Sequence, residues 1–120
     1  MILTVCKKFT FEAAHRLPKH KGKCKNFHGH HYILEVTIGA SLLNGDGMII
    51  DFGDLKEIVN KNIIDIYDHQ NLNDFWVTPT AEIMVRDIAI KLSLLFDKDN
   101  RRLEKLRLYE TPDSYAEVIL

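Results

Sequence analysis

The sequence predicts an α+β fold in which an antiparallel sheet carries two helices on one face. Two long segments near the N-terminus alternate apolar and polar residues, two central segments repeat apolar residues at helical spacing, and two short alternating segments close the chain. This order, β-β-α-α-β-β, is typical of an antiparallel sheet with its helices gathered on one side. We therefore expect residues 1–120 to form a single domain around a four-stranded sheet.

The first two strands are expected at 5–16 and 28–42. In the first, Phe9, Phe11 and Ala13 share a face with His15; in the second, His28 and His30 share a face with Tyr32, Leu34, Val36 and Ile38. The intervening LPKHKGKCKN breaks this pattern and is expected to be a loop. After the second strand, NGDG predicts a turn and MII a short returning strand.

Two helices are expected next. Asp51 can cap the first, whose apolar stripe consists of Leu55, Ile58, Val59, Ile63 and Ile66. The second is expected to begin with Thr78 as the cap and Pro79 at the first helical position. Strands at 103–110 and 115–120, joined by the TPDS turn, complete the chain.

Such a sheet has two unpaired edges and one face without helices. Unpaired edges promote association between chains. We therefore expect this chain to be one subunit of a closed oligomeric barrel.

Composition narrows the functional classes. A net charge of −1 argues against a general nucleic-acid binder, and no apolar run approaches the ~18 residues of a membrane span. The N-terminus shows no cleavable signal pattern, and two cysteines form no disulfide framework, so we expect a cytoplasmic protein.

Positive charge is concentrated near the N-terminus. Residues 1–31 hold seven Lys/Arg and one acid, whereas the rest of the chain holds nine against sixteen. Within this part, Lys19, Lys21, Lys23 and Lys25 alternate along the loop. They form either an ordinary solvated loop or a positive surface that attracts an anionic substrate such as a phosphate ester.

Three histidines are candidate metal ligands. His28 and His30 leave the same face of a strand, and His15 ends the first strand on the face that could pair beside His28. Three neutral imidazoles with one open position form the ligand set of a catalytic zinc. The competing interpretation is that H-x-H on a strand is accidental. His31 is expected to point the other way.

Cys24 is a candidate reactive thiol, because Lys23 and Lys25 flank it and His28 lies four residues on. Cationic neighbours and a nearby metal both favour the thiolate, which could bind the metal or act as a base. Cys6, in an apolar part of the first strand, is expected to be a core residue.

Two further groups could take part in acid–base chemistry or binding. Asp68 could orient His69 and raise its basicity, although adjacent residues in a polar loop need not touch. Glu110 closes a strand and could accept two hydrogen bonds from an amidine edge, or be an ordinary strand-end acid.

Six segments occur in one order along nearly the whole chain: FTFEAAHRLP, CKNFHGHHY, GMIIDFGDLK, YDHQNLND, PTAE and LYET. Together they resemble the 6-pyruvoyl-tetrahydropterin synthase family. The three-residue gap in C-x-x-x-H-G-H resembles the family's bacterial carboxy-synthase branch, since the pyruvoyl enzymes of animals typically have a longer gap.

The resemblance implies the tunnelling fold, in which subunits join their sheets into barrels, usually as two stacked trimers with active sites between subunits. It implies that His15, His28 and His30 bind zinc and that Cys24 is the general base. His69 becomes its partner acid/base, supported by Asp68, and Glu110 anchors the pterin ring and joins the catalytic relay.

The implied substrate is 7,8-dihydroneopterin triphosphate. The carboxy-synthase reaction cleaves its side chain, releases acetaldehyde and triphosphate, and leaves 6-carboxy-5,6,7,8-tetrahydropterin, which leads to queuosine. Two alternatives stay open: the pyruvoyl-synthase reaction, which eliminates only the triphosphate, and a zinc- and pterin-binding module without catalysis.

Overall fold

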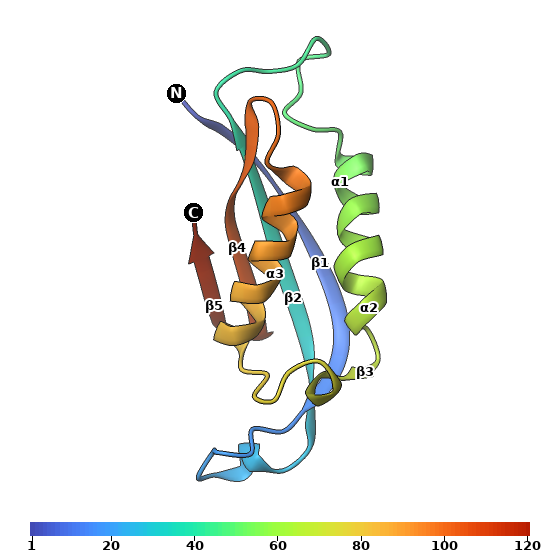
Figure 1. Ribbon diagram of the computed structural model, residues 1–120, viewed down its shortest axis with the longest axis vertical. Coiled ribbons are helices and arrows are strands. Elements are labelled where there is room, and N and C mark those ends of the chain that lie inside the picture. Colours follow the sequence, from blue (N-terminus) through green and yellow to red (C-terminus); the bar gives the residue numbers. More distant parts are fainter.

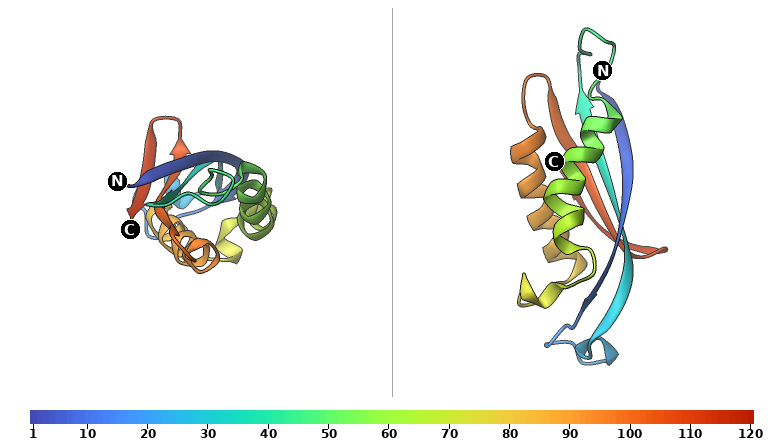
Figure 2. Two further views of the ribbon diagram at one scale, coloured as in Figure 1. Left: turned by 90° about the horizontal axis from the view of Figure 1, so that it is seen from above. Right: turned by 90° about the vertical axis from the view of Figure 1, so that its right-hand side faces the viewer.

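The computed structural model describes residues 1–120 and shows one sheet with the helices packed against one face (Figure 1). The sheet has five strands in the order β3-β1-β2-β4-β5: β1 Leu3–His15, β2 His28–Ala40, β3 Gln70–Asn71, β4 Arg101–Thr111 and β5 Ser114–Ile119. Figure 2 shows that the opposite face carries no helix. The α+β fold with helices on one face is confirmed.

The long hairpin of β1 and β2 is the centre of the sheet. The two strands pair without a break from Leu3 opposite Ala40 to His15 opposite His28. On the two predicted inner faces the apolar side chains are buried and form the core with the helices, whereas His28 and His30 are partly buried. The largest fully buried side chains include Tyr32, Phe11, Phe96 and Leu34. Two-residue alternation therefore identified the inner face correctly.

Cys6 is exposed, which contradicts its prediction as a core residue. Phe9 and Phe11 are buried, so the odd-numbered side chains of this part of β1 face the helices. Cys6 is even-numbered and shares the outer face with Lys8 and Thr10, which are exposed. The alternation decides its side, whatever its hydrophobicity.

The first helical segment begins as predicted at Asp51, whose carboxylate accepts hydrogen bonds from the amides of Gly53 and Asp54. α1 covers Phe52–Val59 and continues through a π-helical segment, η2 (Asn60–Ile64), into α2 (Asp65–Tyr67). The predicted stripe lies against the sheet: Leu55, Val59 and Ile63 are buried, and Ile58 and Ile66 are partly buried.

The second helix, α3 (Ala81–Phe96), begins two residues later than predicted. Its cap is Thr80, whose hydroxyl accepts a hydrogen bond from the amide of Ile83, so Thr78 is not the cap and Pro79 precedes the helix. Both threonines suit a cap by type, and only the hydroxyl of Thr80 accepts a hydrogen bond from the first turn of the helix.

The count of four strands is wrong, because β3 adds a fifth. β3 runs parallel to β1, with Ala13 opposite Gln70 and Ala14 opposite Asn71. Two polar residues give no alternation signal, so this pairing was not visible in the sequence. The NGDG turn is present, with Gly47 at φ 75°, but MII forms no strand; Ile49 and Ile50 are buried from a loop.

The remaining strand limits agree with the predictions to within a few residues. β4 and β5 pair antiparallel around the predicted turn. None of the helices is long and apolar enough to cross a membrane.

Candidate active site

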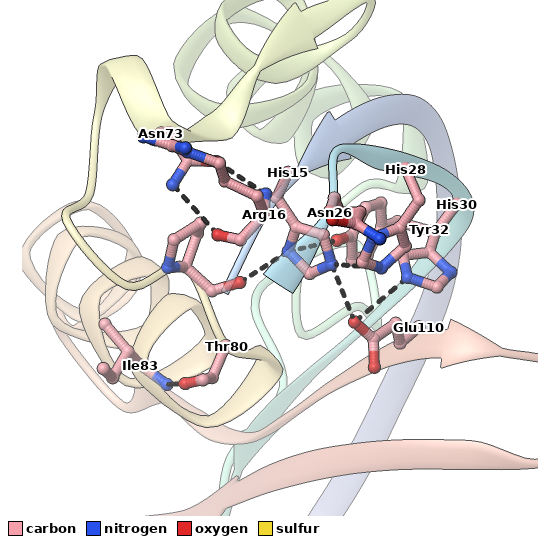
Figure 3. Close-up of polar contacts among 11 residues, drawn as sticks. His15, Arg16, Asn26, His28, His30, Tyr32, Asn73, Thr80, Ile83 and Glu110 are labelled. Atoms are coloured by element: carbon pink, nitrogen blue, oxygen red, sulfur yellow. Dashed lines mark hydrogen bonds and ion pairs between the residues drawn. The ribbon is translucent and has the colours of Figure 1, made fainter. Parts of the chain in front are cut away.

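Three histidine side chains converge where the β1–β2 hairpin meets the start of α3 (Figure 3). The register places His15 directly opposite His28, and His30 follows on the same face of β2. One ring nitrogen from each lies within 4.8 Å of the other two, an arrangement that could hold a metal ion. The predicted convergence of His15 and His28 is confirmed.

Backbone carbonyls fix the orientation of two of these rings. Nδ1 of His15 lies 2.8 Å from the carbonyl oxygen of Pro79, and Nδ1 of His28 lies 2.7 Å from that of Asn26. A carbonyl only accepts, so each Nδ1 must carry the proton and donate it. Nε2 of each ring is then left with a lone pair, the form that binds a metal.

The distances between the ligand atoms fit a metal ion. Nε2 of His15 and Nε2 of His28 are 3.2 Å apart, yet neither has a proton to donate to the other when both rings are neutral. Two nitrogens that share one tetrahedral ion at 2.0–2.1 Å are expected about 3.3 Å apart. Nε2 of His30 is buried and makes no hydrogen bond, although Oε1 of Glu110 lies 3.3 Å away. A cation bound by the three nitrogens would satisfy all of them.

Glu110, near the end of β4, faces the same group. Its Oε1 lies 3.2 Å from Nε2 of His15 and 3.3 Å from Nε2 of His30 (Figure 3). The contact with His15 lowers the pKa of Glu110 against a smaller opposing effect of burial, which favours the ionised carboxylate. A carboxylate beside two nitrogen lone pairs requires protonated rings or a cation between them.

Burial sets the charge state of the surrounding groups. It lowers the pKa of His30, against a smaller opposing effect of Glu110, and so favours the neutral imidazole that a metal requires. Burial also raises the pKa of Tyr32, whose hydroxyl lies 3.4 Å from Nδ1 of His15 and stays protonated.

Asp68 and His69 form the predicted pair, since Oδ2 of Asp68 lies 2.9 Å from Nδ1 of His69. The pair is held against β1 by two backbone contacts: Oδ1 of Asp68 accepts from the amide of Glu12 at 2.9 Å, and the amide of His69 donates to the Glu12 carbonyl. Hydrogen bonds, first from Glu12 and then from His69, lower the pKa of Asp68. His69 has a positive φ of 61°, in the left-handed region that residues other than glycine seldom adopt.

His69 and His30 line the same open cavity of about 500 Å³, together with Phe27 and Gly29, but no hydrogen bond joins them. Glu110 also lines a second cleft, of about 560 Å³, between α3 and β5. The structure thus brings the triad and Glu110 into contact and leaves His69 across an open space.

Cys24 lies in η1 (Lys23–Lys25), a short helical turn in the loop between β1 and β2. It is half-buried and is not part of the histidine group; its carbonyl accepts from the amide of Leu17 at 2.8 Å. Lys19, Lys21, Lys23 and Lys25 are all exposed. His31 contacts Glu12 on the outer face and is not part of the histidine group, as predicted.

Two contributions to the site were not predicted. One is the carbonyl of Pro79, which orients His15; the PTAE segment marked the place but not this role. The other is the side chain of Asn73, which bonds twice to the backbone of Arg16, the residue after His15 (Figure 3). Nothing in the sequence signals a side chain-to-backbone contact across 57 residues.

Three histidines on the β1–β2 hairpin and a carboxylate on β4, in a sheet with its helices on one face, define a class of α+β proteins with a candidate metal centre. Residues 4–119 match the family model of 6-pyruvoyl tetrahydropterin synthase, and the chain belongs to this family of enzymes.

Several relatives carry a narrower name. The 6-carboxy-5,6,7,8-tetrahydropterin synthase of Haemophilus influenzae is 37% identical over 94% of this chain and 96% of its own length. That of Rickettsia typhi is 35% identical over 93% and 96%. Among solved structures, the 6-pyruvoyl tetrahydropterin synthase of Caenorhabditis elegans superposes with a TM-score of 0.87 at 27% identity, covering 100% of this chain and 96% of the other.

Proposed function

We propose that this protein converts 7,8-dihydroneopterin triphosphate and one water to 6-carboxy-5,6,7,8-tetrahydropterin, with release of acetaldehyde and triphosphate. The observation that carries this proposal is the convergence of His15, His28 and His30 on one point beside Glu110, in a family member whose relatives are named for this activity. We place the reaction in the cytoplasm, in 7-deazaguanine and queuosine biosynthesis, and assign it to residues 1–120 acting as one domain.

Zn²⁺ is the proposed cofactor, because three imidazoles leave room for substrate at a fourth position. Zn²⁺ would acidify hydroxyls of the substrate side chain. The protein supplies the rest: the carbonyls of Pro79 and Asn26 keep His15 and His28 in the neutral tautomer with Nε2 available.

Acid–base catalysis is assigned to Cys24 and His69. Cys24 would remove the proton at the carbon attached to the pterin ring. His69 would donate and accept protons during rearrangement through Nε2, because Asp68 holds Nδ1 protonated.

Glu110 is assigned to substrate binding and to the proton relay. Its carboxylate is ionised and half-buried at the border of the 560 Å³ cleft, where it can accept two hydrogen bonds from the amidine edge of a pterin. The exposed lysines of the η1 loop provide positive charge for the triphosphate.

The active form is proposed to be two stacked trimers with each active site between subunits. Two features support association: β3 and β5 leave both edges of the sheet unpaired, and one sheet face carries no helix. A neighbouring chain could bring its Cys24 or its Asp68–His69 pair to the triad.

The pyruvoyl-synthase reaction is the alternative, favoured by the close superposition on the enzyme of Caenorhabditis elegans. It uses the same residue types but removes only the triphosphate and leaves the carbon–carbon bond intact.

The test is a mass spectrum of the pterin formed when zinc-loaded protein meets 7,8-dihydroneopterin triphosphate, with acetaldehyde assayed in parallel. We expect the carboxy product with equimolar acetaldehyde. A pyruvoyl product without acetaldehyde would support the alternative, and tight pterin binding without any product would indicate a non-catalytic module.

Subunit sharing is tested by mixing two inactive variants, Cys24→Ala and His69→Ala, under conditions that exchange subunits. If one site takes these residues from different chains, random mixing restores both to about one quarter of the sites. Turnover that stays at the level of the single variants would assign both residues to the same chain.

A further inference from the structure

We propose that Asn73 is a positioning residue for the metal centre: its side chain takes the place of a paired strand at the end of β1 and fixes the backbone that follows His15. This inference rests on the proposed metal-binding role of His15 and adds a residue outside the ligand set.

On the edge of β1 that faces β3, backbone pairing ends just before His15, the candidate metal ligand. β3 pairs with Ala13 and Ala14, and the chain then turns away into η3 (Leu72–Asp74). His15 and Arg16 consequently have no backbone partner on that side, although β2 pairs with His15 on the other. A strand end with one free edge is expected to fray.

Asn73 completes this edge. Its Oδ1 accepts a hydrogen bond from the amide of Arg16 at 2.8 Å, and its Nδ2 donates to the carbonyl of Arg16 at 3.0 Å (Figure 3). A primary amide is the only short side chain that can both donate and accept in this way, as a backbone peptide does. The backbone amide of Asn73 in turn donates a hydrogen bond to Oδ1 of Asn71 at 3.0 Å, which holds the residue in place.

The segment of residues 68–80, which contains Asn73, also contacts the imidazole of His15. Six residues after Asn73, the buried Pro79 offers the carbonyl that accepts from Nδ1 of His15. Thr80 caps α3 directly afterwards and so fixes where that carbonyl lies. Residues 68–80 thus carry His69 at one end, the carbonyl for His15 at the other, and Asn73 between them.

The consequence is that Asn73 couples the position of the proposed acid–base residue to that of a proposed metal ligand without touching metal or substrate. Without its two hydrogen bonds, the backbone at Arg16 is free to move and His15 loses its fixed approach to His28 and His30. Outer contacts of this kind typically change metal affinity by about 10–100-fold.

The experiment measures the affinity of the full-length protein for Co²⁺ and Zn²⁺ by competition with a chromophoric chelator, together with the Co²⁺ absorption spectrum. Asn73→Ala is expected to bind Zn²⁺ about 10–100-fold more weakly than the wild-type protein and to give an altered Co²⁺ spectrum. The matched control is Asn62→Ala, which also removes an amide-to-carbonyl hydrogen bond, to Ile58, in the helical segment. The control is expected to leave metal affinity unchanged.

Thermal unfolding of the metal-free proteins separates a positioning role from a general loss of stability. If Asn73→Ala lowers the melting temperature but keeps wild-type metal affinity, the proposal is wrong. Should that variant fail to fold, Asn73→Asp decides, since it keeps the acceptor for Arg16 and loses the donor. Its affinity should fall, and an unchanged value would equally overturn the proposal.

Failure of the proposed function gives a different result. A wild-type protein that binds neither Co²⁺ nor Zn²⁺ would remove the metal centre itself, and the positioning role with it. Wild-type binding that Asn73→Ala leaves intact would remove only the role of Asn73.

Discussion

The histidine triad and the Asp68–His69 pair are built in opposite ways. His15 is completely buried and the side chain of His30 is 19% exposed, with the surrounding contacts contributed by β1, β2, β4 and the start of α3. The imidazole of His69 is 76% exposed and is held through Asp68 and two backbone contacts to Glu12. This chain therefore holds the candidate metal ligands from several elements, whereas it holds His69 only through its backbone and through Asp68. The imidazole of His69 is left open to solvent.

The largest effect is expected from substituting a histidine of the triad. His28→Ala should abolish metal binding in the purified protein and with it all turnover, because two nitrogens cannot replace three. Metal content by inductively coupled plasma mass spectrometry checks this. His31→Ala, a histidine of the same strand that points outward, is the control and should keep its metal. Full metal content in His28→Ala would contradict the assignment of the triad.

Substitution of the exposed His69 should lower turnover without changing metal binding. His69→Gln is expected to lower kcat by about 10²–10⁴-fold while metal content stays at the wild-type level, since a lost acid–base group costs this much. Its thermal stability should change little, because exposed side chains contribute within about 0.5 kcal/mol. Parallel loss of metal and turnover would show that the two regions are not independent.

A comparison of the caps of α1 and α3 separates loss of stability from loss of metal binding. Thr80→Ala and Asp51→Ala each remove the side chain that caps a helix and should each lower the free energy of unfolding by about 1 kcal/mol. Only Thr80 adjoins the carbonyl that orients His15, so only its variant should also weaken metal binding. Chemical denaturation and chelator competition measure the two effects, and equal metal affinities would contradict the role of the Pro79 carbonyl.

The smallest expected effect is a pH dependence. The pKa of Asp68 is lowered in the folded protein, first by the amide of Glu12 and then by His69. A depressed pKa stabilises the fold above the unfolded value of about 3.9, and this contribution disappears as pH falls through the lower folded value. NMR titration of the Asp68 carboxyl carbon should show a midpoint below 3.9. Asp68→Asn should make unfolding less dependent on pH in this acidic range; an unchanged dependence would contradict the coupling.

Residue patterns alone determined the α+β fold, the buried faces of β1 and β2, and the placing of three histidines on one face. These follow from side-chain alternation, which each strand fixes locally, and from the antiparallel pairing of two strands that are consecutive in the sequence. The stripe of the first helix was predictable for the same reason, because its period depends only on backbone geometry.

The tertiary structure decided the features that depend on where distant segments meet. β3 joins the sheet, Thr80 caps α3, and the MII segment (48–50) is a loop and not a strand. The tertiary structure also brought Glu110 to the triad, the Pro79 carbonyl to His15 and the Asn73 amide to Arg16, across sequence separations of up to 95 residues. Such contacts are set by loop closure and packing, which act between segments whose own sequences do not encode their partners.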